Sequence, residues 1–158
     1  MKTKYTVITG ASSGIGRAVA LKFAERNKNL ILIARRKNLL ENLKSEILKK
    51  NPDLDIIVID FDLTDVDKIP ELYSKLNNYH IETLINNAGF GMYGDIKEQP
   101  LNKISDMLHL NVEILTLLSS LYVQDYHNEE GSQLINISSA GGTQSSRTEL
   151  STVPQNFT

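Results

Sequence analysis

Gly10, Gly14 and Gly16 are the residues whose type and spacing indicate chemistry most directly, in the stretch "TVITGASSGIGRAVALKF". They stand between a β-branched run and a segment with helical periodicity. A strand, a glycine turn and a helix in this order bring backbone N–H groups and a helix N-terminus onto a pyrophosphate. Gly10 permits the tight turn, Gly14 the close approach of a ligand, and Gly16 the close packing of helix and strand. The hydroxyls of Ser12 and Ser13 can bond phosphate or cap the helix. The alternative is a tight turn without a ligand.

Polar residues also end later apolar runs, in the stretches "DFDLTD", "LINNAGFGMYG" and "LINISSAGG". Each of these taken alone is typical of a strand end, a helix cap or a turn. Asn111 is different, because it falls inside the apolar stripe of the long helical segment "LNKISDMLHLNVEILTLLSSLYV". A buried amide without partners costs about 1–3 kcal/mol. Asn111 is therefore either satisfied structurally or retained for function.

The stretch from Thr9 to Gly16 resembles the T-G-x-x-x-G-x-G fingerprint of the short-chain dehydrogenase/reductase family. The resemblance extends from about residue 4 to about residue 142, and further motifs follow in the family's order. It implies a cofactor-binding turn made of Gly10, Ala11, Ser12, Ser13, Gly14, Ile15 and Gly16. It also implies that Asp62 and Leu63 border the adenine ring. Within the N-N-A-G motif, Asn87, Ala88 and Gly89 are expected to adjoin the cofactor and to brace the sheet.

Arg35 and Arg36 follow the second apolar run, where an enzyme that uses NAD carries an Asp or Glu for the ribose 2′-hydroxyl. A guanidinium group can instead bond a 2′-phosphate bidentately. The resemblance therefore favours NADP over NAD as the cofactor. The alternative is that the two arginines only begin a solvated helix.

The resemblance assigns catalytic roles to Asn111, which would hold a water in a proton relay, and to Ser139, which would position a substrate carbonyl in preference to Ser138. Hydride transfer to a carbonyl also needs an acid, and the family uses a Tyr whose pKa is lowered by a Lys four residues later. That Tyr is expected near position 152, which is Thr152, and neither Tyr nor Lys occurs after Ser139. The chain as written is not expected to catalyse hydride transfer at an enzymatic rate.

The ending "GGTQSSRTELSTVPQNFT" is polar and has no apolar period. Residues 143–158 are expected to be an aberrant, disordered tail after an incomplete dinucleotide-binding domain, residues 1–142. Codons can be chosen for Ser151 to Thr158 that, read from the third base, encode Tyr-Cys-Ala-Thr-Lys-Phe-Tyr, which contains a Tyr-x-x-x-Lys motif. This favours a one-base frame change after about Gly142, followed by early termination. The alternative is a truncation for unrelated reasons.

Short β-branched runs alternate with amphipathic segments, which predicts a doubly wound α/β sheet of the Rossmann type. Five buried parallel strands are expected at residues 4–9, 29–34, 55–60, 82–86 and 132–138. The C-terminal part of the family fold is expected to be missing. The long helical segment has apolar residues at 104, 107, 108, 115 and 118. It also carries Leu110, Leu117 and Leu121 on another side, which suits packing against a partner subunit.

The composition excludes several other classes of protein. A net charge of −2 gives no reason to expect a nucleic-acid or anionic-membrane partner. Cysteine is absent, and His80, His109 and His127 lack metal-ligand spacing, so no metal is expected. No run approaches the length that spans a bilayer, and the first residues do not form a signal peptide. The cytoplasm is therefore the expected location.

Three functions remain compatible with these features. The first is an NADP-preferring oxidoreductase for a small-molecule ketone, aldehyde or secondary alcohol, inactive as written. The second is a nucleotide-binding remnant without chemistry, and the third is a pseudogene-like product with no function as a folded protein. Full-length relatives are expected to be homo-oligomers through the helix that contains Asn111.

Overall fold

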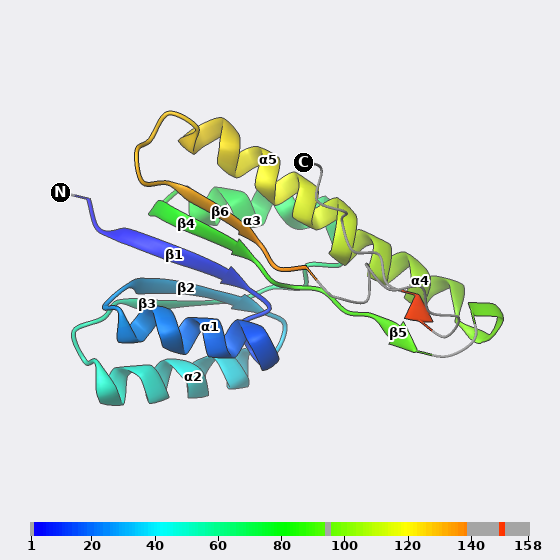
Figure 1. Cartoon of the computed structure of the whole chain (residues 1–158), viewed down its shortest axis with the longest axis horizontal. Coiled ribbons are helices and arrows are strands. Elements are labelled where there is room, and N and C mark those ends of the chain that lie inside the picture. The colour runs from blue at the N-terminus through cyan, green and yellow to red at the C-terminus, as the bar shows by residue number, and fades with distance from the viewer. Residues whose placement is uncertain (1, 94–95, 139–148, 151–158) are drawn as a thin grey trace.

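The computed structural model describes residues 2–93, 96–138 and 149–150. Its centre is a five-stranded sheet of order β3-β2-β1-β4-β6, in which every neighbouring pair is parallel. The strands are β1 (Lys4–Thr9), β2 (Asn29–Ala34), β3 (Ile56–Asp60), β4 (His80–Asn86) and β6 (Gln133–Asn136). Because all five run in the same direction, their carboxyl ends share one edge of the sheet (Figure 1).

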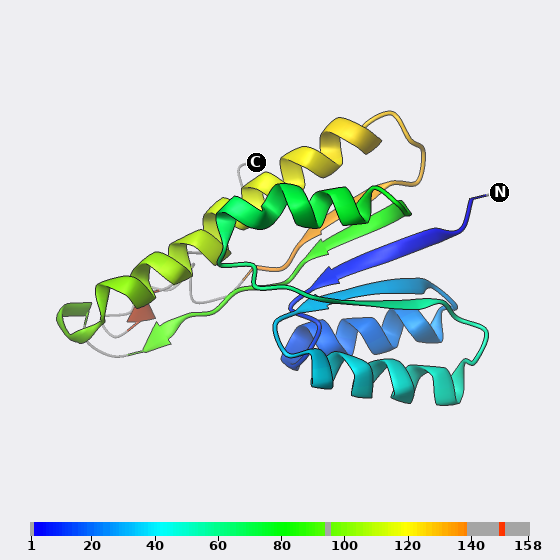
Figure 2. The same ribbon diagram turned by 180° about the vertical axis from the view of Figure 1, so that it is seen from behind.

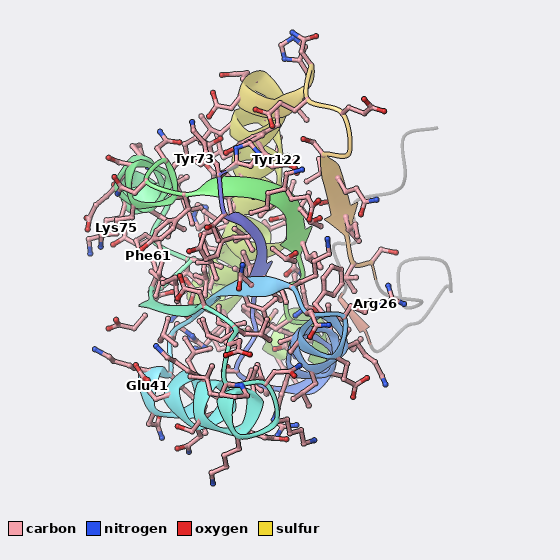
Figure 3. All side chains as sticks on the ribbon, turned by 90° about the vertical axis from the view of Figure 1, so that its left-hand side faces the viewer. Arg26, Glu41, Phe61, Tyr73, Lys75 and Tyr122 are labelled. Atoms are coloured by element: carbon pink, nitrogen blue, oxygen red, sulfur yellow. The ribbon has the colours of Figure 1, made fainter. Side chains whose placement is uncertain are left out.

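Helices cover both faces of this sheet. They are α1 (Gly14–Glu25), α2 (Lys37–Lys50), α3 (Ile69–Leu76) and α5 (Leu115–Tyr126). The first two lie on one face and the last two on the other (Figure 2). A view along the sheet separates the same layers, with Glu41 on one side and Tyr73 and Tyr122 on the other (Figure 3). The predicted doubly wound α/β architecture is confirmed.

The strands are continuously apolar because alternate residues serve the two layers. In β2, Leu30 and Leu32 pack into the cluster formed with α1 and α2. Ile31 and Ile33 pack into the cluster formed with α3 and α5. All four side chains are fully buried. A parallel strand covered on both faces needs apolar residues at every position, and this requirement made the strands visible in the sequence.

A second pair of strands was not predicted. β5 (Met92–Tyr93) pairs antiparallel with β7 (Glu149–Leu150). Glu149 and Leu150 fall in the stretch expected to be a disordered tail, so that expectation does not hold at these two residues. Two residues are too few for a period to reveal a strand. The remainder of the predicted tail lies outside the described residues.

The long helical segment contains a turn that its periodicity did not predict. A π-helical stretch, His109–Ile114, separates α4 (Leu101–Leu108) from α5. The residues that the segment buries are Met107, Ile114, Leu118 and Tyr122. A π-helical turn holds more residues than an α-helical turn and is frequent at functional sites. Asn111 lies within it.

The predicted faces of this helical segment are therefore partly wrong. Leu108 was expected in the buried stripe and is 43% exposed, because α4 extends beyond the carboxyl edge of the sheet (Figure 1). Leu110 and Leu121 were expected to face outward, and both are partly buried against the core. The wider π-helical turn rotates the residues around it away from the α-helical period. Leu117 is exposed as predicted.

Glu82, on β4, forms ion pairs with lysines at the amino-terminal ends of β1 and β2. It accepts a hydrogen bond from Lys28 at 2.8 Å and lies 3.7 Å from Lys4. Lys28 precedes β2, whereas Lys4 begins β1 and Glu82 lies on β4. The hydrogen bond from Lys28 holds the pKa of the Glu82 carboxyl below its usual value, although partial burial opposes this.

We expect Glu82→Gln to lower the free energy of unfolding by about 1 kcal/mol at pH 7. A carboxyl whose pKa is lower in the folded state stabilises the fold above its unfolded pKa, and the contribution is lost as the pH falls through the folded pKa. Wild type and variant should therefore converge near about pH 3. Urea denaturation at both pH values measures this. Glu71→Gln, which removes the exposed Glu71–Lys75 pair within α3, is the control. An equal loss in both variants would contradict the assignment.

Candidate functional site

The glycine turn between β1 and α1 lies at the carboxyl edge of the sheet. Gly10 has a φ of +66° and Gly14 a φ of +55°, and a Cβ disfavours both conformations. A Cβ on Gly10 would lie 2.9 Å from the Cα of Ala88, so the turn contacts the segment after β4 directly. A Cβ on Gly14 would meet no described atom within 4 Å. The backbone at Gly14 is therefore accessible to a ligand.

Gly16 packs α1 against this turn. A Cβ on Gly16 would lie 2.3 Å from the carbonyl oxygen of Gly10 and 2.4 Å from Nδ2 of Asn87. The same Nδ2 donates hydrogen bonds to the carbonyls of Thr9 (3.2 Å) and Gly10 (3.3 Å). The Asn87 amide thus occupies the space that a larger residue at position 16 would need.

Thr9 completes the connection between β1 and β4 and was not predicted as a site residue. Its hydroxyl oxygen accepts hydrogen bonds from the backbone N–H groups of Asn87 and Ala88, both at 3.0 Å. The side chain of Thr9 is 1% exposed. The signal that could have identified it is a Thr at the end of an apolar strand, immediately before the glycine turn.

The outer side of the turn faces solvent. Ala11 and Gly16 are buried, whereas Ser13, Gly14 and Ile15 are exposed. These exposed residues form the start of α1, where backbone N–H groups have no partner within the helix. The helix N-terminus also carries the positive end of the helix dipole. Both features favour an anion at this position.

A basic pair lies beside the turn. Arg36 donates hydrogen bonds to the hydroxyls of Ser12 (3.4 Å) and Ser13 (3.2 Å). Arg35 is exposed and acts electrostatically on Asp62. Desolvation by itself would raise the pKa of Asp62, but hydrogen bonds from Thr64 and the charge of Arg35 lower it overall. Both arginines therefore lie at the carboxyl edge, next to the glycine turn and the end of β3.

Asp62 and Leu63 point in different directions. The Asp62 carboxylate is exposed and accepts hydrogen bonds from the N–H (3.0 Å) and the hydroxyl (2.7 Å) of Thr64. Leu63 is 4% exposed and belongs to the core cluster under α3 and α5. Asp62 can therefore offer a polar side chain to a ligand, whereas Leu63 can offer only its backbone.

A polar network around Asn86 was not predicted from the sequence. Nδ2 of the buried Asn86 donates to Ser119 Oγ and to Asn136 Oδ1, both at 3.0 Å. These bonds join β4 to α5 and to β6, and Ile137 adds a backbone bond to the carbonyl of Asn86 at 2.9 Å. Together they fix the end of β6, which is the segment that leads to Ser138.

The side-chain amide of Asn111 makes two hydrogen bonds to the backbone of Phe90. Its Nδ2 donates to the Phe90 carbonyl (2.7 Å), and its Oδ1 accepts from the Phe90 N–H (3.0 Å). A Cβ on Gly89 would lie 2.9 Å from the same Oδ1. Asn111 is half-buried rather than buried, and its amide is satisfied by backbone. The structure thus brings Asn111 next to Gly89, at the same edge as the glycine turn.

The serines predicted to follow the last strand are only partly described. Ser138 is exposed, and Ser139 lies outside the described residues, as does Thr152. A Tyr and a Lys at the spacing of the missing motif do occur earlier, at Tyr93 and Lys97. They follow Gly89 and precede Ser139, which is not the order that the family resemblance implies.

Two further findings concern the described residues only. They contain no group of three or more His, Cys, Asp or Glu side chains that could hold a metal ion. None of the helices described is both long enough and apolar enough to cross a membrane.

The chain belongs to the short chain dehydrogenase family, whose sequence profile matches residues 4–150. The glycine turn, the N-N-A-G motif and the parallel sheet are thus those of a family of NAD(P)-dependent oxidoreductases. An uncharacterized oxidoreductase of Mycobacterium tuberculosis is 34% identical over 141 residues, which cover 86% of this chain and 54% of the relative.

Two of the solved structures that share the fold are similar over most of this chain. The bulky-bulky ketone specific alcohol dehydrogenase of Comamonas testosteroni has a TM-score of 0.83 at 33% identity, covering 90% of this chain and 57% of that protein. A short-chain dehydrogenase of Sphingobium yanoikuyae, in complex with NADPH, has a TM-score of 0.82 at 30% identity, covering 89% and 55%. The chain therefore spans about half the length of the relatives it matches.

We expect Gly16→Ala to destabilise the fold by about 2 kcal/mol or more, because the added methyl group must displace the Gly10 carbonyl or the Asn87 amide. The control is Gly91→Ala, since a Cβ there meets no described atom within 4 Å. Gly91→Ala should change the free energy of unfolding by less than about 0.5 kcal/mol. Thermal and urea unfolding measure both variants. A neutral Gly16→Ala would show that α1 is not packed on the turn in this way.

Proposed function

We propose that this chain binds a phosphorylated nicotinamide dinucleotide, NADP or NADPH, at the carboxyl ends of β1, β2 and β4. The observation that carries the proposal is the position of Arg36, whose guanidinium group contacts Ser12 and Ser13 at the exposed start of α1. A guanidinium group beside an accessible glycine turn suits a ligand that carries a 2′-phosphate as well as a pyrophosphate. NADPH in the Sphingobium yanoikuyae relative supports this choice.

The residues present fit such a ligand. The backbone from Ser12 to Ile15 would hold the pyrophosphate, because a Cβ on Gly14 would meet no described atom within 4 Å. Arg35 and Arg36 would hold the 2′-phosphate, where an enzyme that uses NAD carries an acid. Asp62 and the backbone of Leu63 would border the adenine ring, and Asn87, Ala88 and Gly89 would adjoin the rest of the cofactor.

The wider function is that of an oxidoreductase for a carbonyl or a secondary alcohol, for which the bound nicotinamide would supply or accept the hydride. Asn111 contributes by holding the Phe90 backbone in place, and one donor and one acceptor site of its amide remain for a water. Ser139 would position the substrate carbonyl. Neither residue can replace the missing acid, because an amide and an alcohol do not release a proton readily near neutral pH.

The 158 residues would therefore bind the nucleotide without rapid hydride transfer. Leu117, which is exposed on the helical segment that contains Asn111, suits packing against a second subunit in full-length relatives. A small-molecule substrate, no nucleic-acid partner and a cytoplasmic location complete the proposal. The alternative that the chain has no function as a folded protein predicts neither cooperative unfolding nor nucleotide binding.

We expect the 158-residue chain to bind NADPH more tightly than NADH, and Arg36→Ser to weaken NADPH binding about tenfold or more. A tenfold loss corresponds to about 1.4 kcal/mol. NADH binding should change little, because NADH lacks the 2′-phosphate. Arg26→Ser is the matched control, since Arg26 caps the opposite end of α1. Isothermal titration calorimetry measures the affinities of the wild type and both variants for each nucleotide.

Equal affinity for NADPH and NADH, unchanged by Arg36→Ser, would contradict the preference for NADP. Absence of binding by a cooperatively folded chain would contradict the nucleotide site itself. Oxidation of NADPH in the presence of a ketone, at an enzymatic rate, would contradict the proposal that the chain lacks its acid.

A further inference from the structure

Ser105, His109 and Glu113 form a hydrogen-bonded chain along the outer side of the helical segment. Ser105 Oγ lies 3.1 Å from His109 Nε2, and His109 Nδ1 lies 2.6 Å from Glu113 Oε2. The three residues are spaced four positions apart, and side chains at this spacing are neighbours on one face of a helix. Ser105 and Glu113 are exposed, so solvent and solutes reach the hydroxyl.

The imidazole is oriented as a base for the serine. An ionised carboxylate only accepts hydrogen bonds, so Glu113 places the proton of a neutral His109 ring on Nδ1. Nε2 is then the acceptor for the hydroxyl proton of Ser105. A hydroxyl bonded to a base that a third group orients is the arrangement of an activated nucleophile.

Apolar side chains flank this chain of hydrogen bonds. Leu108 is 43% exposed and Val112 is 41% exposed. Leu108 stands three positions after Ser105 in α4, so the two are neighbours on the helix surface, and Val112 follows Leu108 by about one turn. An acyl group lying on Leu108 and Val112 would bring its carbonyl carbon to Ser105.

We propose that Ser105 is an acylation site, which accepts an acyl group from an ester or thioester with a good leaving group. Ser105 Oγ forms a bond to the carbonyl carbon, and the bond from this carbon to the leaving oxygen or sulfur breaks. The hydroxyl proton passes to His109 Nε2 and then to the leaving group, so no oxidant or reductant is needed. A water deprotonated by His109 later releases the acyl group as a carboxylic acid.

Acylation of Ser105 is faster than hydrolysis of the resulting serine ester. Ser105 stands on an open helix surface and not in a pocket, and preorganised stabilisation of the oxyanion usually contributes most to the acceleration of acyl transfer. A positioned general base contributes about 10²–10⁴-fold on its own. A good leaving group permits acylation under these conditions, whereas hydrolysis of the serine ester is slow, so the acyl-serine accumulates.

This site is separate from the proposed nucleotide site. Asn111 stands two positions from both His109 and Glu113, and residues two apart on a helix do not face each other. The amide of Asn111 contacts Phe90, whereas Ser105 and Glu113 face solvent. Acylation and nucleotide binding can therefore succeed or fail independently.

The test is the reaction of the full 158-residue chain with para-nitrophenyl octanoate, followed by peptide mass mapping. We expect one octanoyl group per chain, on Ser105, formed about 10²-fold faster than on the exposed Ser120 of α5. Ser105→Ala should abolish the modification, and His109→Gln and Glu113→Gln should each slow it about tenfold or more. Ser120→Ala is the matched control and should leave the rate unchanged.

The acyl chain provides a second readout. The octanoate ester should acylate Ser105 faster than para-nitrophenyl acetate, and Leu108→Gln with Val112→Thr should remove this preference without changing the rate with acetate. Equal modification of Ser105 and Ser120, or an unchanged rate in His109→Gln, would overturn the proposal. The hydrogen bonds among Ser105, His109 and Glu113 would then be ordinary helix-surface contacts without a role in acylation. Affinity for NADPH, measured in Ser105→Ala, should equal that of the wild type in either case.

Discussion

The contact of one side-chain amide with two glycines determines the form of the carboxyl edge of the sheet. Nδ2 of Asn87 bonds the carbonyls of Thr9 and Gly10 and fills the space in front of Gly16. This contact ties the end of β1, the segment after β4 and the start of α1 to one another. The helix N-terminus is therefore aimed at the strand ends, and Gly14 is left open to a ligand.

The same edge depends on a local departure from α-helical geometry. The π-helical stretch around Asn111 directs an amide toward the backbone of Phe90, where it makes a reciprocal pair of hydrogen bonds. A Cβ on Gly89 would lie 2.9 Å from Asn111 Oδ1, so a larger residue at position 89 would displace this amide. The segment after β4 is thus held in two places, by the hydrogen bonds of Asn87 to β1 and the glycine turn and by those of Asn111 to Phe90. Preorganisation of this kind lowers the entropic cost of binding.

The sheet and its order could be predicted because parallel strands covered on both faces are continuously apolar, and because the glycine turn marks the first crossover. Family motifs, and not periodicity, predicted that Arg36 lies beside the glycine turn and that Asn111 lies beside Gly89. Periodicity failed at Leu108 and Leu110, since a π-helical turn and a helix extending past the sheet both break a 3.6-residue pattern. The Thr9 and Asn86 bonds could not be predicted, because each joins residues distant in the sequence.

The measurement that tests the nucleotide site most directly is the change in backbone amide chemical shifts when NADP⁺ is added to the ¹⁵N-labelled chain. The largest changes are expected from Ser12 to Ile15, at Arg35 and Arg36, and at Ala88 and Gly89, with the outer face of α2 unaffected. Changes confined to other surfaces, or none at saturating NADP⁺ in a chain that gives a dispersed spectrum, would contradict it.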